Sequence, residues 1–330
     1  MILKAVLLSL ALAAPLAAQV PNAGPNAPAS VSAEEGHALG NAQAHDAGAA
    51  SESGSEAKKS SEFDPMHHVQ DGRTLEFPPF GEVHLPPEHY WQVGPVDMTP
   101  TRHVVFVWMT ALVLLLVFVP AGLAAKRRHQ GNSPGRKRHN AVEAAVLFFR
   151  DEVVMQNIGH GGEGYAGYLV TLFFFILVAN LFGLLPWGAS ATANIGVTAA
   201  LALISFIVVE VSGMRALGPL GYLKTIVYIP PGLPVWLIPI MAVIMTPVEL
   251  LGKLAKPFAL AVRLMANMMA GHIVLLSLFG VGLAFGGVAF AGPGLMALML
   301  TFLELFVAFL QAYVFVVLTS VFIGLIRHAH

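Results

Sequence analysis

One arginine, Arg263, lies inside an apolar run that is long enough to cross a bilayer, within residues 256–272. A guanidinium at that depth costs roughly 2.5 to 3.5 kcal/mol on insertion scales, so it usually faces a protein interior or a water-filled cavity and marks an ion path. A structural ion pair with Glu249 or Glu304 would also explain it. The polar residues around Arg263 decide between these two explanations.

Helix geometry gives those polar residues defined depths. Asn267 follows Arg263 by four residues and shares its face. His272 follows by nine residues, roughly 180° around and about 13 Å further toward the outside. Glu249 precedes Arg263 by fourteen residues, on about the same face and about 20 Å toward the cytoplasm, unless Pro257 bends the helix. Arg263 thus separates an outer titratable group from an inner one.

The last apolar segment carries Glu304 and Gln311, seven residues apart and therefore on one helix face, about 10 Å from each other. An antiparallel return would bring Glu304 to the depth of His272, and a carboxylate beside an imidazole can pass a proton near neutral pH. Plainer explanations exist for isolated groups. A lone Asn or Gln often joins membrane helices by hydrogen bonds, and Glu210 could simply reach the interface. The clustering of these residues near the C-terminus favours a proton path.

The composition indicates a membrane protein. Of the 330 residues, 56% are hydrophobic and only 11% are charged, with a mean hydropathy of +0.71, which is too little polar surface for a soluble globule. The chain has no cysteine, which excludes disulfides and thiolate chemistry. Its N-terminal histidines have no regular ligand spacing, and no phosphate-binding Gly-rich Lys motif, GxSxG or HExxH occurs. We expect no cofactor and no catalysis by this chain alone.

The N-terminal hundred residues divide into three parts. Residues 1–18 have the pattern of a secretory signal peptide, although Leu16 departs from the small residue expected before a cut after Ala18, and an uncleaved anchor is the alternative. Residues 19–63 are poor in aromatic and β-branched residues, which predicts disorder. Residues 64–101 are rich in Pro and aromatics, which predicts an extended extracytoplasmic segment at the membrane surface, with Tyr90 and Trp91 at headgroup level.

The remainder, residues 102–330, is the predicted membrane domain. Lys126, Arg127 and Arg128 follow the first span at once, so the positive-inside rule places the N-terminus outside and, after five spans, the C-terminus inside. Residues 140–154 have apolar residues at helical spacing and predict an interfacial or packed helix. The last span would be about 50 Å long, so it should tilt strongly. The predicted spans are about 103–125, 165–186, 194–213, 257–285 and 294–326.

Residues 235–251 are apolar but contain or follow several prolines. A full crossing here would place the later basic residues outside, against the positive-inside pattern. We therefore expect a re-entrant or interfacial helix on the cytoplasmic side. The predicted fold class is an all-α polytopic membrane protein with five transmembrane helices plus this extra helix, the last two spans being long and tilted.

The polar residues and their neighbours resemble subunit a of the F-type ATP synthase, the stator half of the rotary proton motor. A weaker match is 180–186 (NLFGLLP) followed by Asn194, and the resemblance covers about residues 98–327. The N-terminal region is longer than usual, and His272 and Glu304 stand exchanged relative to the common bacterial pattern, an exchange that other members share. The main matching motifs are Glu249-Leu250-Leu251, Lys256-Pro257, Arg263-Leu264, Asn267, Ala270-Gly271 and Leu310-Gln311-Ala312.

This resemblance implies two offset half-channels built against a ring of c subunits. Arg263 would face the ring carboxyl and block direct leakage of protons. His272, Glu304, Asn267 and Gln311 would line the outer half-channel, and Glu249 the inner one. The implied partners are the c-subunit ring, the b-subunit peripheral stalk and the rest of the complex in a bacterial inner membrane. The His in the outer set favours H⁺ over Na⁺.

A proton-coupled secondary transporter is the alternative, since it would also use buried ionisable residues. It predicts inverted repeats with broken helices in corresponding halves, and the sequence has no evident internal symmetry of that kind.

Overall fold

The computed structural model describes residues 74–77, 81–86, 92–93, 96–97, 99–129, 137–185, 188, 190–226, 234–285 and 291–328. The predicted signal peptide (1–18) and disordered extension (19–63) lie outside the described residues. Within the predicted surface segment 64–101, four short strands form two antiparallel pairs. These are β1 (Thr74–Phe77) with β2 (Gly81–His84), and β3 (Gln92–Val93) with β4 (Val96–Asp97).

From residue 102 on, the described chain is helical, and five helices are long and apolar enough to cross a membrane. This confirms the predicted polytopic, helical membrane architecture. The five are α3 (Arg102–His129), α6 (Glu163–Gly183), α7 (Ile195–Ile226), α8 (Ile238–Phe285) and α9 (Ala291–Arg327). Shorter elements are α4 (Lys137–Phe148), the π-helix η1 (Phe149–Met155), α5 (Gln156–Ile158) and the 3-10 turns η2 (Ala191–Ala193) and η3 (Val235–Leu237).

The segment 235–251 differs from its prediction, because it is not a separate re-entrant or interfacial helix. From Ile238 it is the first part of α8, which continues for 48 residues. Pro239 lies in the first turn, where a missing N–H loses no intrahelical bond. Pro247 and Pro257 lie inside α8 without ending it. At the usual rise per residue α8 is about 72 Å long, more than twice the thickness of a hydrocarbon core.

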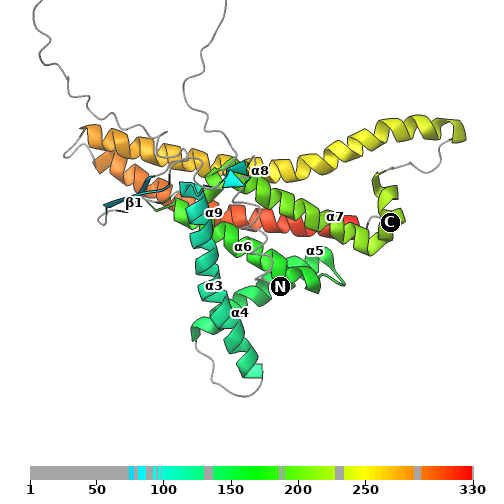
Figure 1. Ribbon diagram of the computed structural model, residues 1–330, viewed down its shortest axis with the longest axis horizontal. Coiled ribbons are helices and arrows are strands. Elements are labelled where there is room, and N and C mark those ends of the chain that lie inside the picture. The colour runs from blue at the N-terminus through cyan, green and yellow to red at the C-terminus, as the bar shows by residue number, and fades with distance from the viewer. Residues whose placement is uncertain are drawn as a thin grey trace, which may run out of the picture.

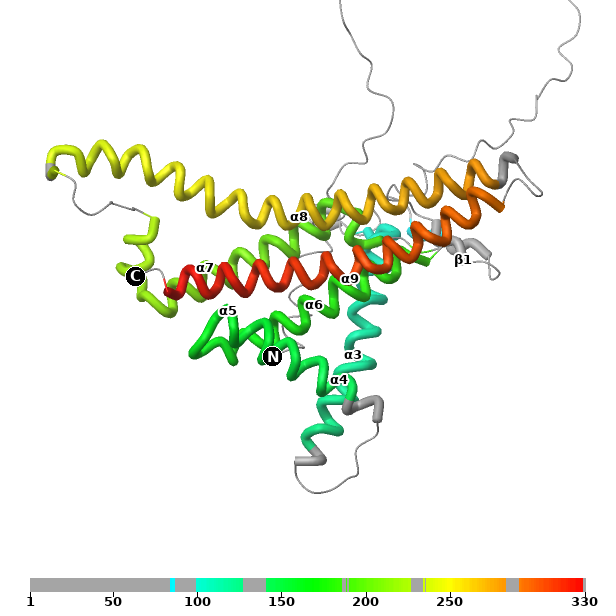
Figure 2. The backbone as a smooth tube through the Cα atoms, turned by 180° about the vertical axis from the view of Figure 1, so that it is seen from behind, coloured from blue at the N-terminus to red at the C-terminus, as the bar shows by residue number. Residues whose placement is uncertain are grey.

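The two last helices run side by side in opposite directions along the long axis of the molecule (Figures 1 and 2). α3 crosses them steeply in both views, so these helices cannot all follow one membrane normal. At least one of these helices must therefore be tilted from the membrane normal, and the strong tilt expected of the last two helices stays a prediction. The first part of α8, yellow in Figure 1, projects past the end of α9.

The core lies between α3, α6, α7, α8, α9 and the π-helix η1. Phe149 of η1 stacks on Phe173 of α6 with ring centroids 4.1 Å apart, and Phe173 meets Phe309 of α9 edge-on at 5.7 Å. Val153 and Val154 are also buried, so the predicted helix at 140–154 packs against the bundle. Within a membrane, such close packing stabilises the bundle through van der Waals contact between the helices.

Asn180 fixes α9 against α6. Its side-chain amide is fully buried and donates a hydrogen bond to the Ala308 carbonyl at 3.1 Å, while it accepts one from the Thr192 hydroxyl at 2.6 Å. Buried amides of this kind join membrane helices. Ala308 lies one turn from Glu304 and from Gln311, so this contact sets the position of both.

Candidate functional site

Arg263 lies on the outer face of α8, where its side chain is exposed. Ala259, Ala266 and Ala270 are exposed at helical spacing on either side of it. Asn267, one turn on, is half-buried at the edge of the same face. The guanidinium is therefore surrounded by small side chains, and another helix could approach this face closely.

No ion pair joins Arg263 to Glu249 or to Glu304 in the described part of the chain. The structural ion pair that would explain Arg263 without an ion path is thus absent from the described residues. A cation on an apolar outer face needs an anion supplied from elsewhere.

The predicted outer residues lie between α8 and α9. His272 and Glu304 are each 8% exposed and Gln311 is 7% exposed, and Glu304 and Gln311 share the buried face of α9 as predicted. A methyl group built on Gly271 would lie 2.8 Å from Glu304 Oε1. The Glu304 carboxylate therefore rests against the α8 backbone one residue before His272, so the two helices meet at the depth that the sequence predicts.

The close approach at Gly271 predicts the effect of Gly271→Ala. The added methyl group would force the Glu304 carboxylate away from its place beside α8. We expect ATP-driven proton pumping by inverted membrane vesicles to fall several-fold with the complex still assembled. Gly252→Ala is the matched control, because a methyl group there meets nothing within 4 Å. Equal pumping by the two variants would contradict the contact.

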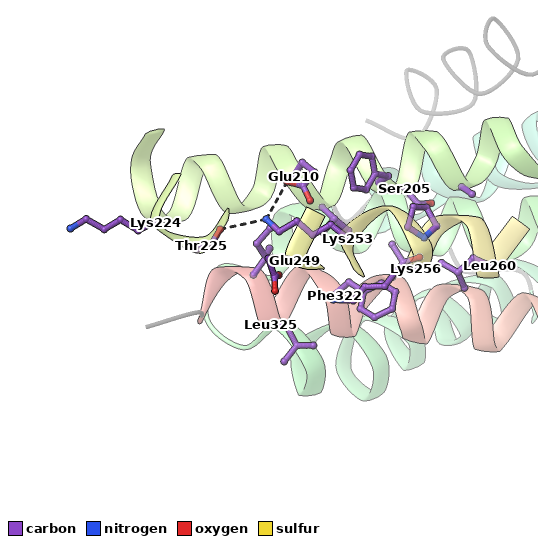
Figure 3. A pocket seen from close by; sticks show the side chains of 16 residues that line it. Ser205, Glu210, Lys224, Thr225, Glu249, Lys253, Lys256, Leu260, Phe322 and Leu325 are labelled. Carbon is purple, nitrogen blue, oxygen red and sulfur yellow. Dashed lines mark hydrogen bonds and ion pairs between the residues drawn. The ribbon is translucent and has the colours of Figure 1, made fainter. Parts of the chain in front are cut away.

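Glu249 lies at a cavity of about 720 Å³ between α7, α8 and α9 (Figure 3). The cavity wall is mostly apolar but carries charged and hydroxyl side chains. Its lining comprises Ala202, Ser205, Phe206, Val209, Glu210, Lys224, Thr225, Glu249, Lys253, Lys256, Pro257, Leu260, Thr319, Phe322, Leu325 and Ile326. Glu249 therefore lies apart from the buried pair at His272 and Glu304, toward the start of α8.

A kink in α7 completes this cavity. Gly218 adopts a positive φ of 73°, a conformation that favours glycine, and Pro219 follows it. The last turns of α7 then bring Tyr222 and Thr225 to α8, where Lys253 Nζ lies 4.6 Å from the Tyr222 ring centroid and 3.4 Å from the Thr225 hydroxyl. These contacts depend on tertiary structure and have no signal in local sequence.

Glu210, for which the sequence favoured the plain explanation of reaching the interface, also lines the cavity. Its Oε2 lies 3.9 Å from Lys253 Nζ, and the two side chains are 13% and 10% exposed. Lys253 was not singled out by its sequence context. Its position four residues after Glu249, and so on the same helix face, was the available signal.

Two polar regions thus share α8, with Arg263 between them. By helical rise, Glu249 lies about 21 Å before Arg263 and His272 about 13 Å after it. Glu249 in one region and Glu304 in the other can each bind and release protons. The positive charge of Arg263 lies between them and can prevent a proton from passing directly from one region to the other. Among the described residues, no group of three or more His, Asp or Glu side chains could hold a metal ion.

Comparisons with known proteins identify the family to which this chain is similar. Residues 104–324 match the family model described as ATP synthase A chain. ATP synthase subunit a 2 of Chlorobaculum tepidum is 44% identical over 79% of this chain and 71% of its own length. ATP synthase subunit a of Chloroherpeton thalassium is 46% identical over 80% and 76%. ATP synthase subunit a of Anaeromyxobacter dehalogenans is 42% identical over 94% and 83%.

Proposed function

The chain belongs to the ATP synthase A chain family, and on that premise we propose that it conducts protons through two offset half-channels against a ring of c subunits. Proton flow through them turns the ring and drives ATP synthesis elsewhere in the complex. The names of the relatives favour this function over a proton-coupled secondary transporter.

The exposed, unpaired guanidinium of Arg263 carries the proposal. It lies on the outer face of α8 among alanines, with no ion-pair partner in the described chain. Because small side chains let a partner helix approach, a carboxyl on that helix can come within reach. Arg263 would then stabilise the ionised carboxyl, release its proton, and block direct passage between the half-channels.

The outer half-channel is assigned to His272, Glu304, Asn267 and Gln311. Burial of three of these between α8 and α9, and the contact of Glu304 with the backbone beside His272, support a proton relay at this depth. Asn267 lies between the relay and Arg263 along α8.

The inner half-channel is assigned to Glu249 and its cavity. A cavity of about 720 Å³ can hold water, so protons can reach Glu249 without crossing apolar side chains. Arg263 lies further along the same helix.

In this function the chain is a non-catalytic subunit of the bacterial inner membrane, with its N-terminus outside and its C-terminus in the cytoplasm. The c ring lies on the Arg263 face and the b-subunit stalk holds the chain still. Each proton moving down 100 mV releases about 2.3 kcal/mol, so several protons are needed for each ATP.

Glu249→Gln tests the inner half-channel. The amide keeps the size of the side chain but cannot exchange a proton, so we expect the rate of ATP-driven proton pumping by inverted vesicles, per assembled complex, to fall several-fold. Glu163→Gln is the control, since Glu163 is an exposed acid at the start of α6. Unchanged pumping by Glu249→Gln across the cytoplasmic pH range would remove Glu249 from the path.

A further inference from the structure

We propose that Glu210 and Lys253 form a counter-ion pair that keeps the inner cavity electrically balanced around Glu249. Lys253 is a positioning residue in this scheme, acting on Glu249 through its charge, and Glu210 cancels that charge. The inference rests on the proposed role of Glu249 as the inner proton-exchanging group.

The pair is built into the contact between α7 and α8. Glu210 Oε2 is buried and accepts no hydrogen bond from the described residues, so the ammonium of Lys253, 3.9 Å away, is the nearest charge that offsets it, with Lys256 as a second cation that acts on it more weakly. Lys253 is held in place by the Thr225 hydroxyl and the Tyr222 ring. Figure 3 shows Glu210 reaching from α7 toward Lys253.

The remaining charges at the cavity are few. From α7 the lining has Glu210 and Lys224, and Lys224 points away from the other labelled residues (Figure 3). From α8 it has Glu249, Lys253 and Lys256, and the Lys256 ammonium lies 5.3 Å from the Phe322 ring centroid. The residues that α9 contributes to the lining carry no charge.

Glu249 and Lys253 lie one helical turn apart on the same face of α8. If Glu210 lost its charge, the unbalanced ammonium would oppose proton binding at Glu249. If Lys253 lost its charge, the unbalanced carboxylate of Glu210 would favour proton binding there. Removing the charge of Glu210 and removing the charge of Lys253 should therefore change proton binding at Glu249 in opposite directions. If the pair were only a structural contact, either change would impair transport in the same way.

The test measures the initial rate of ATP-driven proton pumping by inverted vesicles carrying the whole complex, per assembled complex, at each external pH. The external solution is then the cytoplasmic side. Glu210→Gln should move the alkaline midpoint of this profile to lower pH, and Lys253→Gln should move it to higher pH, each by roughly half a pH unit for one charge at this range. The double variant should return the midpoint to that of the unmodified protein.

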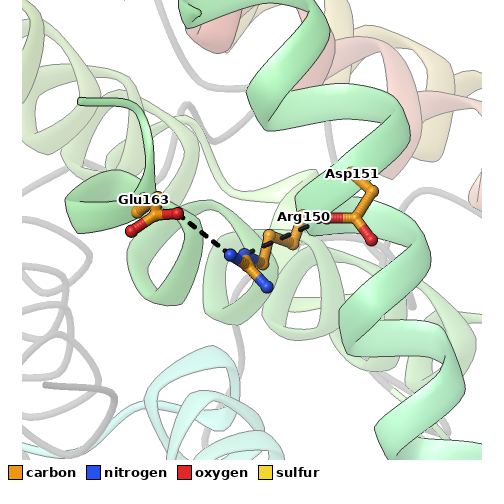
Figure 4. Close-up of polar contacts among 3 residues, drawn as sticks. All are labelled: Arg150, Asp151 and Glu163. Atoms are coloured by element: carbon orange, nitrogen blue, oxygen red, sulfur yellow. Dashed lines mark hydrogen bonds and ion pairs between the residues drawn. The ribbon is translucent and has the colours of Figure 1, made fainter. Parts of the chain in front are cut away.

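A matched ion pair provides the control. Arg150 and Glu163 also pair, at 3.0 Å, but their side chains are 42% and 66% exposed and neither lines the cavity (Figure 4). Arg150→Gln and Glu163→Gln should leave the midpoint in place.

Midpoints that stay fixed or move in the same direction in the two single variants would overturn the inference. Where a single variant fails to assemble, the double variant decides, because it leaves neither charge unpaired. In the double variant, a midpoint equal to that of the unmodified protein supports the counter-ion pair. A shifted midpoint or loss of pumping in the double variant contradicts it. Failure of the Glu249→Gln prediction would instead remove the proposed inner half-channel itself.

Discussion

Arg263→Ala is expected to abolish proton-driven ATP synthesis. The side chain is exposed and forms no ion pair in the described chain, so its removal leaves the packing of α8 unchanged and the complex should assemble in normal amounts. In the proposed function, loss of the guanidinium leaves the carboxyl of the ring without a fixed counter-charge, and protons can pass between the half-channels without turning the ring. Synthesis by energised inverted vesicles and passive proton leakage are the two measurements, and the second should rise as the first vanishes.

Two further variants sharpen this result. Arg150→Ala removes another partly exposed arginine, one that pairs with Glu163, and should leave synthesis intact. Arg263→Lys keeps a positive charge but lacks the planar guanidinium group with its paired N–H donors. It should therefore support little more ATP synthesis than Arg263→Ala. Near-normal synthesis by Arg263→Ala would end the assignment of this residue as the barrier.

The exchange His272→Glu with Glu304→His is expected to retain more proton-driven synthesis than replacement of either residue by Ala. Both side chains are buried between α8 and α9, and the Glu304 carboxylate lies against the backbone of the residue before His272. The exchange keeps one imidazole and one carboxyl in that space, so a proton can still pass from one to the other. Each Ala variant leaves a single group with no relay partner.

Synthesis rates of the two Ala variants and the double exchange, each corrected for assembled complex, form the comparison. A double exchange that is as inactive as the single changes would show that His272 and Glu304 act independently. Gly252→Ala serves again as an α8 variant with free space around the added methyl group.

The helices and the faces of their polar residues follow from local sequence. Five long apolar runs predict five helices, and the seven-residue spacing predicts that Glu304 and Gln311 share a face, as they do. These features depend on hydropathy and on the helical repeat, which are properties of single segments.

Other features depend on contacts between distant segments and could not be predicted in this way. The prolines near 235–251 favoured a separate helix, yet Pro239 lies in the first turn and Pro247 inside a continuous α8. The pairing of Glu210 with Lys253 requires the packing of α7 on α8. The contact of the Lys253 ammonium with the Tyr222 ring requires the turn at Gly218. A sequence pattern reveals none of these distances.

The continuity of α8 has a mechanical consequence for a stator. A single helix carries Glu249, Arg263 and His272, with Pro257 between the first two, so no loop separates the three residues. If a c ring pushes against Arg263, as proposed, the reaction force travels along α8 in both directions. No loop between the three residues can absorb it by bending. The two proposed half-channels would therefore stay aligned while the ring turns. Less of the torque on the ring would be lost in deforming α8.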